Sequence, residues 1–142
     1  MKKLITFSLL ALVCSGNMIA VEDKDHVALA NTHAKKGNYQ ESLDAINAQI
    51  EKDPTDARAY KIRGHIYYAM GNYEKSMADV NHVVEMTPKS ANAYVDRSII
   101  YGRLGKHKEA MDDIDHALEI NPRSVFALAV KSRIEEEQDS KK

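Results

Sequence analysis

The sequence predicts an all-α fold in which three helical hairpins, each 34 residues long, stack side by side. The first observation is that the three prolines of the 142-residue chain are spaced 34 residues apart. The second is that three of its six glycines repeat at the same spacing in another register. Because proline and glycine both interrupt helices, two sets with one period indicate a repeated structural unit. The two sets are Pro54, Pro88 and Pro122, and Gly37, Gly71 and Gly105.

Each repeated unit is predicted to contain two helices joined by a glycine turn. In the middle unit, residues 57–70 and 73–85 carry apolar side chains at helical spacing. Gly71 between them tolerates the left-handed conformation that ends a helix, and Pro88 prevents the second helix from continuing. The predicted units are 23–56, 57–90 and 91–124.

Small side chains recur where the two helices of a unit must approach each other closely. They occupy one repeat position on the first helix and one on the second, and a larger side chain at either position would push the helices apart. These residues are Ala30, Gly64 and Ser98 on first helices, and Ser42, Ser76 and Ala110 on second helices.

The middle unit resembles the tetratricopeptide repeat in the residues that define its pattern. These residues are Tyr60, Arg63-Gly64, Tyr67, Gly71-Asn72-Tyr73, Ser76, Val80, Val83 and Pro88. The third unit matches about as well. The first unit is degenerate, with His26 and His33 where an aromatic residue and a tyrosine are expected. The resemblance implies a superhelical stack of helix-turn-helix hairpins with a concave inner face. It does not identify the ligand.

Residues 125–138 are predicted to form a helix that caps the stack. This segment begins with six apolar residues and ends in an acidic run. Members of the family typically close their stack with a solvating helix, because an open end needs a cap for solubility. Residues 139–142 are expected to be a short tail.

Residues 1–20 have the organisation of a secretory signal peptide. Lys2 and Lys3 precede an apolar run at 4–13, and small and polar residues follow. The run has about half of the roughly 20 residues that a membrane span needs. We therefore expect an exported protein, periplasmic or secreted, with cleavage after Gly16 or Ala20.

The single cysteine of the chain leaves a second outcome of processing open. A bacterial lipoprotein signal ends at a cysteine that becomes lipidated, and the polar residues after Cys14 would make a plausible tether. Val13 stands where such a signal has a small residue, which favours the soluble form. The alternative is a membrane-anchored lipoprotein, and a membrane is expected as a partner only in that case.

The charge balance argues against a nucleic-acid partner. The chain has 20 basic and 21 acidic residues. Removal of residues 1–20 would leave 18 basic and 21 acidic residues, a net charge of −3. Such a chain has no basic excess with which to hold a phosphate backbone.

No combination of residues indicates catalysis, a metal or a cofactor. Two of the six histidines, His82 and His116, occupy equivalent repeat positions, with Asp79 and Asp112 nearby on the same helices. A zinc site needs three or four converging ligands, and equivalent positions of neighbouring units lie about one helix pair apart. We interpret these residues as surface positions. Phosphate-binding loops, HExxH and GxSxG motifs are absent from the sequence. We therefore expect a protein that is not an enzyme.

The resemblance implies that first helices line the concave face and that this face binds a peptide or a partner protein. Apolar side chains surrounded by Lys and Arg suit a segment with acidic groups or a free carboxylate. An alternative is that the convex side or an edge makes the contact. The candidate partner-binding residues are Asn31, Arg58, Lys61, Ile62, His65, Tyr68, Val95, Ile99, Arg103 and Phe126.

Some cytosolic members of the family hold a peptide carboxylate with a clamp of five Lys, Arg and Asn residues. Of the corresponding residues here, only Asn31 fits. The other four positions hold Val27, Ile62, Asn92 and Asp96. The sequence therefore predicts a non-enzymatic interaction scaffold of the bacterial cell envelope rather than an adaptor for chaperone tails. A lipid-anchored subunit of an envelope or pilus-assembly complex is the alternative. The oligomeric state stays open.

Overall fold

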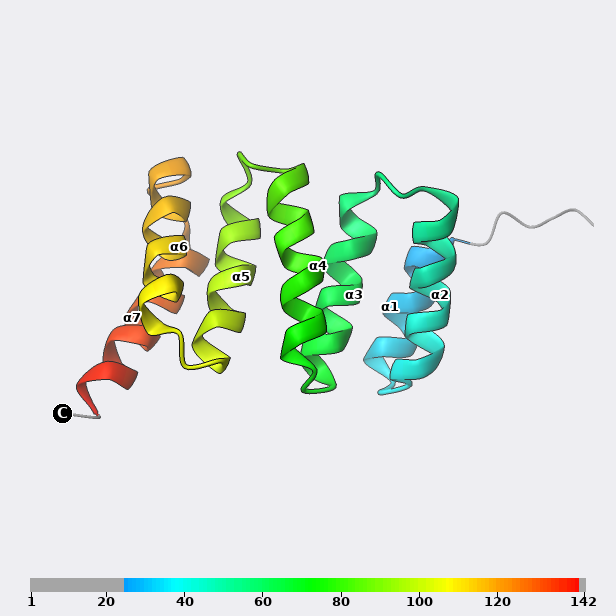
Figure 1. Ribbon diagram of the computed structural model, residues 1–142, viewed down its shortest axis with the longest axis horizontal. Coiled ribbons are helices and arrows are strands. Elements are labelled where there is room, and N and C mark those ends of the chain that lie inside the picture. Colours follow the sequence, from blue (N-terminus) through cyan, green and yellow to red (C-terminus); the bar gives the residue numbers. More distant parts are fainter. Residues whose placement is uncertain (1–24, 141–142) are drawn as a thin grey trace, which may run out of the picture.

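The computed structural model describes residues 25–140, and this part of the chain forms seven α-helices and no strands. The helices run antiparallel in a single row (Figure 1). Their bounds are α1 His26–Lys35, α2 Tyr39–Lys52, α3 Ala57–Ala69, α4 Tyr73–Met86, α5 Ala91–Arg103, α6 His107–Ile120 and α7 Val125–Asp139. This confirms the all-α stack of three hairpins followed by one more helix. The predicted signal peptide and Cys14 lie outside the described residues.

A left-handed glycine ends the first helix of every hairpin. Gly37, Gly71 and Gly105 have φ angles of 78°, 75° and 72°. The residue after each glycine closes one helix and begins the next. The Asn72 N–H donates to the Tyr67 carbonyl at 2.9 Å, while the Asn72 side chain accepts from the Lys75 N–H. The turn between the two helices is short for this reason.

Small residues bring the two helices of a hairpin into contact, as the sequence predicts. The Ser76 hydroxyl, which is fully buried, donates to the Gly64 carbonyl at 2.7 Å. A Cβ atom placed on Gly64 would lie 3.1 Å from Cγ2 of Val80. In the first hairpin, Ser42 donates to the Ala30 carbonyl at 2.6 Å. The helices of a hairpin are thus held by a buried hydrogen bond at the point where they lie closest.

An arginine on α3 and another on α5 each join three helices. The Arg63 guanidinium donates two hydrogen bonds to Asp79 on α4, at 2.9 and 2.7 Å. It donates a third to Asn47 on α2, at 2.9 Å. The hydrogen bonds to Asp79 raise the pKa of Arg63 above its usual value. The same set recurs 34 residues later as Arg97, Asp113 and Asn81. We call these two sets the arginine ladder.

The arginine ladder corrects one sequence interpretation. Asp79 was expected on the surface beside His82, but its residue exposure is only 5%. Its carboxylate is directed at Arg63, whereas His82 lies edge-on to the ring of Tyr60 at a centroid distance of 4.4 Å. The aspartate and the histidine therefore belong to two different contacts.

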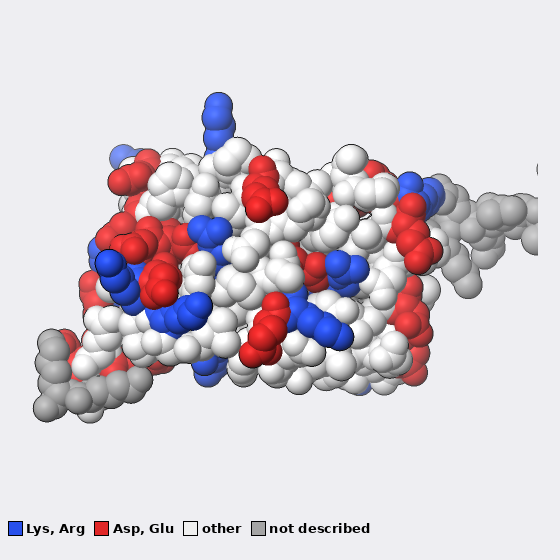
Figure 2. All heavy atoms as spheres, in the orientation of Figure 1, with Lys and Arg blue, Asp and Glu red and all other residues white. Residues whose placement is uncertain are grey.

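The helices form two layers. In Figure 1, α2 and α6 lie in front of α1 and α7. The even-numbered helices form the outer, convex layer, and α1, α3, α5 and α7 form the inner one. Figure 2 shows the convex side, on which acidic and basic side chains are interspersed. Among residues 25–140, no helix has both the length and the apolar character needed to cross a bilayer.

Candidate partner-binding groove

Three hollows follow one another along the inner layer of helices. The first lies between α1 and α3 and has a volume of about 170 Å³. The central hollow lies among α3, α5 and α7, with about 230 Å³. The third lies between α5 and α7, with about 90 Å³. His65 lines both the first and the central hollow, and Ile99 lines both the central and the third. The three hollows therefore form one continuous row, which we call the groove.

Most of the candidate partner-binding residues line this groove. The first hollow includes Asn31, Ile62 and His65. The central hollow includes His65, Tyr68, Ile99 and Phe126, and the third includes Ile99 and Arg103. The structure thus brings seven of the ten residues to one surface. Lys61 contacts the groove through an aspartate, while Arg58 and Val95 do not line it.

Val95 is wrong as a surface residue, because its exposure is 0%. It belongs to a buried cluster that includes Ala127, Val130 and Ile134 of α7. The family register places residue 95 on the inner layer, and the sequence interpretation did not account for the helix that packs over that position. Val95 therefore stabilises the cap and cannot contact a partner.

Arg58 serves the start of α3 instead of the groove. The Asp56 carboxylate accepts from the Arg58 backbone N–H at 3.0 Å and from its side-chain Nε at 3.1 Å. The hydrogen bond from the Arg58 side chain holds the pKa of Asp56 below its ordinary value of 3.8. Arg58 thus completes a helix cap and carries no unpaired charge toward the groove.

Asp96 is a groove residue that was not among the ten. Its side chain is 10% exposed and lies in the wall of the central hollow. Its Oδ2 atom lies 3.3 Å from Nζ of Lys61 and 3.5 Å from Nε2 of His65. The sequence contains a signal for it, since the same repeat position holds Ile62 in the middle unit and Ala28 in the first. Lys61 is consequently an ion-paired cation, although the sequence interpretation counted it as free.

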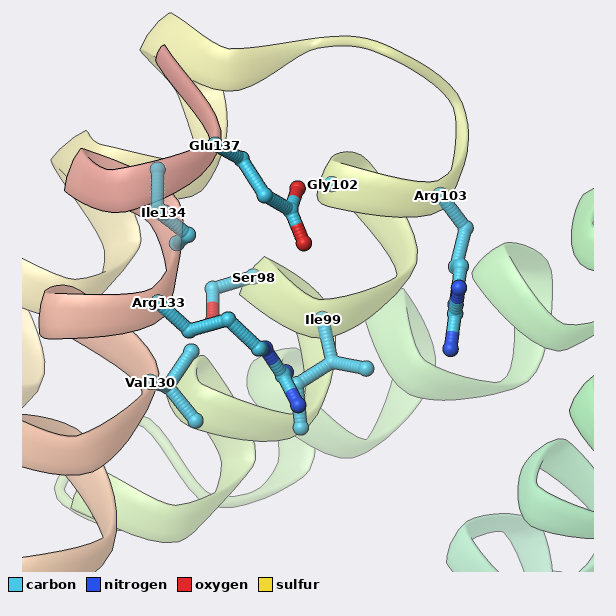
Figure 3. A pocket seen from close by; sticks show the side chains of 8 residues that line it. All are labelled: Ser98, Ile99, Gly102, Arg103, Val130, Arg133, Ile134 and Glu137. Atoms are coloured by element: carbon cyan, nitrogen blue, oxygen red, sulfur yellow. The ribbon is translucent and has the colours of Figure 1, made fainter. Parts of the chain in front are cut away.

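Arg103 and Tyr68 join α5 to α3 across the rim of the groove. Nε of Arg103 donates to the Tyr68 hydroxyl at 2.7 Å, and this hydrogen bond raises the pKa of Arg103. Arg133 and Glu137 of α7 line the third hollow with Arg103 (Figure 3). These two were not among the ten residues, because the acidic end of α7 reads as a solvated cap. The groove therefore changes from apolar at its centre to charged at its C-terminal end.

The described residues contain no group of three or more His, Cys, Asp and Glu side chains that could hold a metal ion. Their titratable groups near the groove are engaged in the contacts given above, with Arg133 and Glu137 at its end. The chemistry that this surface offers is an apolar hollow with hydrogen-bond donors at its rim. Such a surface suits binding.

Two models of the tetratricopeptide repeat match the chain, at residues 27–91 and 91–124. No curated protein matches the chain in sequence. Among solved structures, the first repeat domain of Spaghetti (RPAP3), bound to the HSP90 peptide SRMEEVD, is 23% identical with a TM-score of 0.72. That match covers 85% of this chain and 98% of the other.

Two further solved structures have the same fold. The first repeat domain of human RPAP3 is 24% identical with a TM-score of 0.75, over 82% of this chain and 91% of the other. YrrB, described as having an unusual peptide-binding site, is 20% identical with a TM-score of 0.70, over 75% and 55%. The matched repeats, the glycine turns and the two-layered stack agree, and the chain belongs to the tetratricopeptide-repeat family.

Proposed function

We propose that this protein is a non-enzymatic scaffold that binds a peptide or a partner protein in the groove. The observation that carries the proposal is the central hollow, which is lined by Tyr68, Ile99 and Phe126 and open to solvent beside Arg103. Phe126 is 48% exposed, an unusual state for a large apolar side chain that has no partner. Binding would cover it.

The solved structures support a peptide ligand with acidic groups. The Spaghetti domain is described with the HSP90 peptide SRMEEVD, and the second human RPAP3 domain with the HSP70 peptide SGPTIEEVD. Both peptides end in the same acidic motif. This chain would hold such a ligand differently, because Asp96 stands where the family clamp has a base. Arg103 and Arg133 are the cations that remain near the central hollow.

We further propose that the protein acts in the bacterial cell envelope after export. The support is the charged, apolar and small-residue order of residues 1–20. Lipidation of Cys14 would instead anchor the same scaffold to a membrane, as a subunit of an envelope or pilus-assembly complex.

Site-specific photo-crosslinking in the native organism tests the binding surface. A photoreactive amino acid placed at Phe126 or Asn31 reports on the groove, and the same residue at Ala78 or Asp112 reports on exposed convex positions. We expect one crosslinked partner from the groove positions, identified by mass spectrometry. Crosslinks from the convex positions alone would contradict the proposed binding surface.

A further inference from the structure

We propose that the groove ends in a receptor for the C-terminal residue of a peptide. An apolar last side chain enters the central hollow, and its α-carboxylate lies between Arg103 and Arg133. This inference rests on the proposed function, because it specifies which part of a peptide the groove takes. The two arginines differ from the positions of the family clamp, of which this chain keeps only Asn31.

The geometry places the apolar and the charged parts of the site next to each other. Ile99 is a wall of both the central and the third hollow. Figure 3 shows the side chains of Arg133 and Arg103 on either side of Ile99. A ligand atom above Ile99 therefore has a guanidinium on each side and an apolar hollow beside it. A carboxylate bound to two guanidiniums forms strong, charge-assisted hydrogen bonds.

Both guanidiniums have donors to spare. Arg103 uses Nε for the Tyr68 hydroxyl, which fixes the plane of the guanidinium and leaves its other N–H groups available. Within residues 25–140, neither Arg103 nor Arg133 forms an ion pair with a carboxylate. Glu137 is the carboxylate that lines the same hollow. Two cations and one anion leave one positive charge, which matches a single carboxylate.

Asp96 gives the bound peptide a direction. Its carboxylate lies in the wall of the central hollow, where it repels a second carboxylate. The negative end of the ligand is therefore driven to the arginine side of Ile99. The rest of the peptide extends the opposite way, past His65 and toward the first hollow, which His65 also lines.

A terminal carboxylate satisfies this arrangement better than an acidic side chain. In an extended peptide, consecutive side chains point to opposite faces, so an apolar residue and an acidic neighbour cannot both enter the groove. Residues two apart share a face but lie about 6–7 Å from each other along the strand. The two hollows, in contrast, meet at one side chain. An α-carboxylate shares its Cα atom with the apolar side chain and so reaches both.

The test is a titration of the purified ¹⁵N-labelled protein, followed by NMR through its backbone amides and arginine Nε–H groups. The probe is acetyl-Ala-Ser-Gly-Ser-Leu with a free carboxylate, and it is compared with the same peptide as a carboxamide. We expect the free acid to shift the Nε–H signals of Arg103 and Arg133 and the amide of Ile99. We expect the carboxamide, or a free acid that ends in Ser, to bind at least 10-fold more weakly.

The variant R103Q/R133Q should lose the preference for the free acid. R123Q removes an exposed arginine outside the groove and is the matched control, with circular dichroism to verify that both variants are folded. Equal affinity for acid and carboxamide, or no effect of R103Q/R133Q, would overturn the inference.

A third peptide, acetyl-Ala-Glu-Leu-Glu-Ala carboxamide, separates this inference from the proposed function. If it shifts groove residues while the free-acid peptide does not, the groove binds internal acidic segments, and only the inference fails. If no peptide shifts any groove residue, both the inference and a peptide-binding groove are contradicted.

Discussion

The guanidinium of Arg63 holds the carboxylate of Asp79, sixteen residues later, through hydrogen bonds of 2.9 and 2.7 Å. The Asp79 side chain is 7% exposed and that of Arg63 is 23% exposed, so water screens this pair little. Because both charges are largely removed from water, each depends on the other. This dependence leads to the first prediction.

Asp79→Ala should lower the free energy of unfolding by about 3 kcal/mol, because the change leaves Arg63 partly buried without its counter-charge. Urea unfolding followed by circular dichroism measures it. Lys131→Ala breaks the much more exposed pair with Asp115 and should cost about 0–1 kcal/mol. Equal costs for the two variants would show that the ladder pair is as well solvated as a surface pair.

The pKa of Asp56 leads to a prediction on acid stability. Its folded-state pKa is lowered, so the carboxylate contributes stability above the ordinary value of 3.8 and loses that contribution as the pH falls through the lower, folded-state pKa. Asp56→Asn should therefore destabilise the protein at pH 6. The gap to the wild type should narrow below pH 3.8. Urea unfolding between these pH values and pH 2.5 measures the gap, and a gap independent of pH would contradict the assignment.

Two glycines within first helices differ in the space around them. A Cβ on Gly102 meets nothing within 4 Å, whereas a Cβ on Gly64 meets Val80 at 3.1 Å. Gly102→Ala should raise stability by about 0.5–1 kcal/mol through helix propensity. Gly64→Ala should gain less, and Gly64→Leu should lose about 1–3 kcal/mol by overpacking. Thermal melts compare the three variants. A stable Gly64→Leu protein would place the contact between α3 and α4 elsewhere.

Tyr68 supplies both a ring to the central hollow and a hydroxyl to Arg103. Tyr68→Ala should raise the dissociation rate of the partner, because most differences in affinity at one interface lie in that rate. Tyr68→Phe keeps the ring and should have a smaller effect. Surface plasmon resonance with the crosslinked partner gives both rates. An effect confined to the association rate would indicate that the tyrosine steers the partner and does not anchor it.

The stack was predictable because backbone requirements recur at one period. Only glycine adopts the turn conformation at Gly71 without strain, and only a small residue fits at Gly64, so the sequence shows both directly. The arginine ladder was not predicted, because Arg and Asp usually mark a surface and their pairing depends on the distance between α3 and α4. A spacing of sixteen residues, repeated in two units, is the signal that would have found it.

The groove was predicted in outline and missed at its C-terminal end. The first helices were expected to line it, and the register of one unit gives their inner positions. The packing of α7 is a separate matter, since it buries Val95 and brings Arg133 beside Arg103. A repeat pattern describes contacts between like units. It does not describe a helix that has no counterpart in the other units.

The arginine ladder also determines how this molecule can change its length. Arg63 reaches sixteen residues back to Asn47 and sixteen forward to Asp79, and Arg97 repeats both contacts. A second copy of residues 57–90, inserted after residue 90, would therefore meet suitable partners at both of its faces. A duplication of the coding segment for this unit would lengthen the groove by one step without the need for any new interface to evolve.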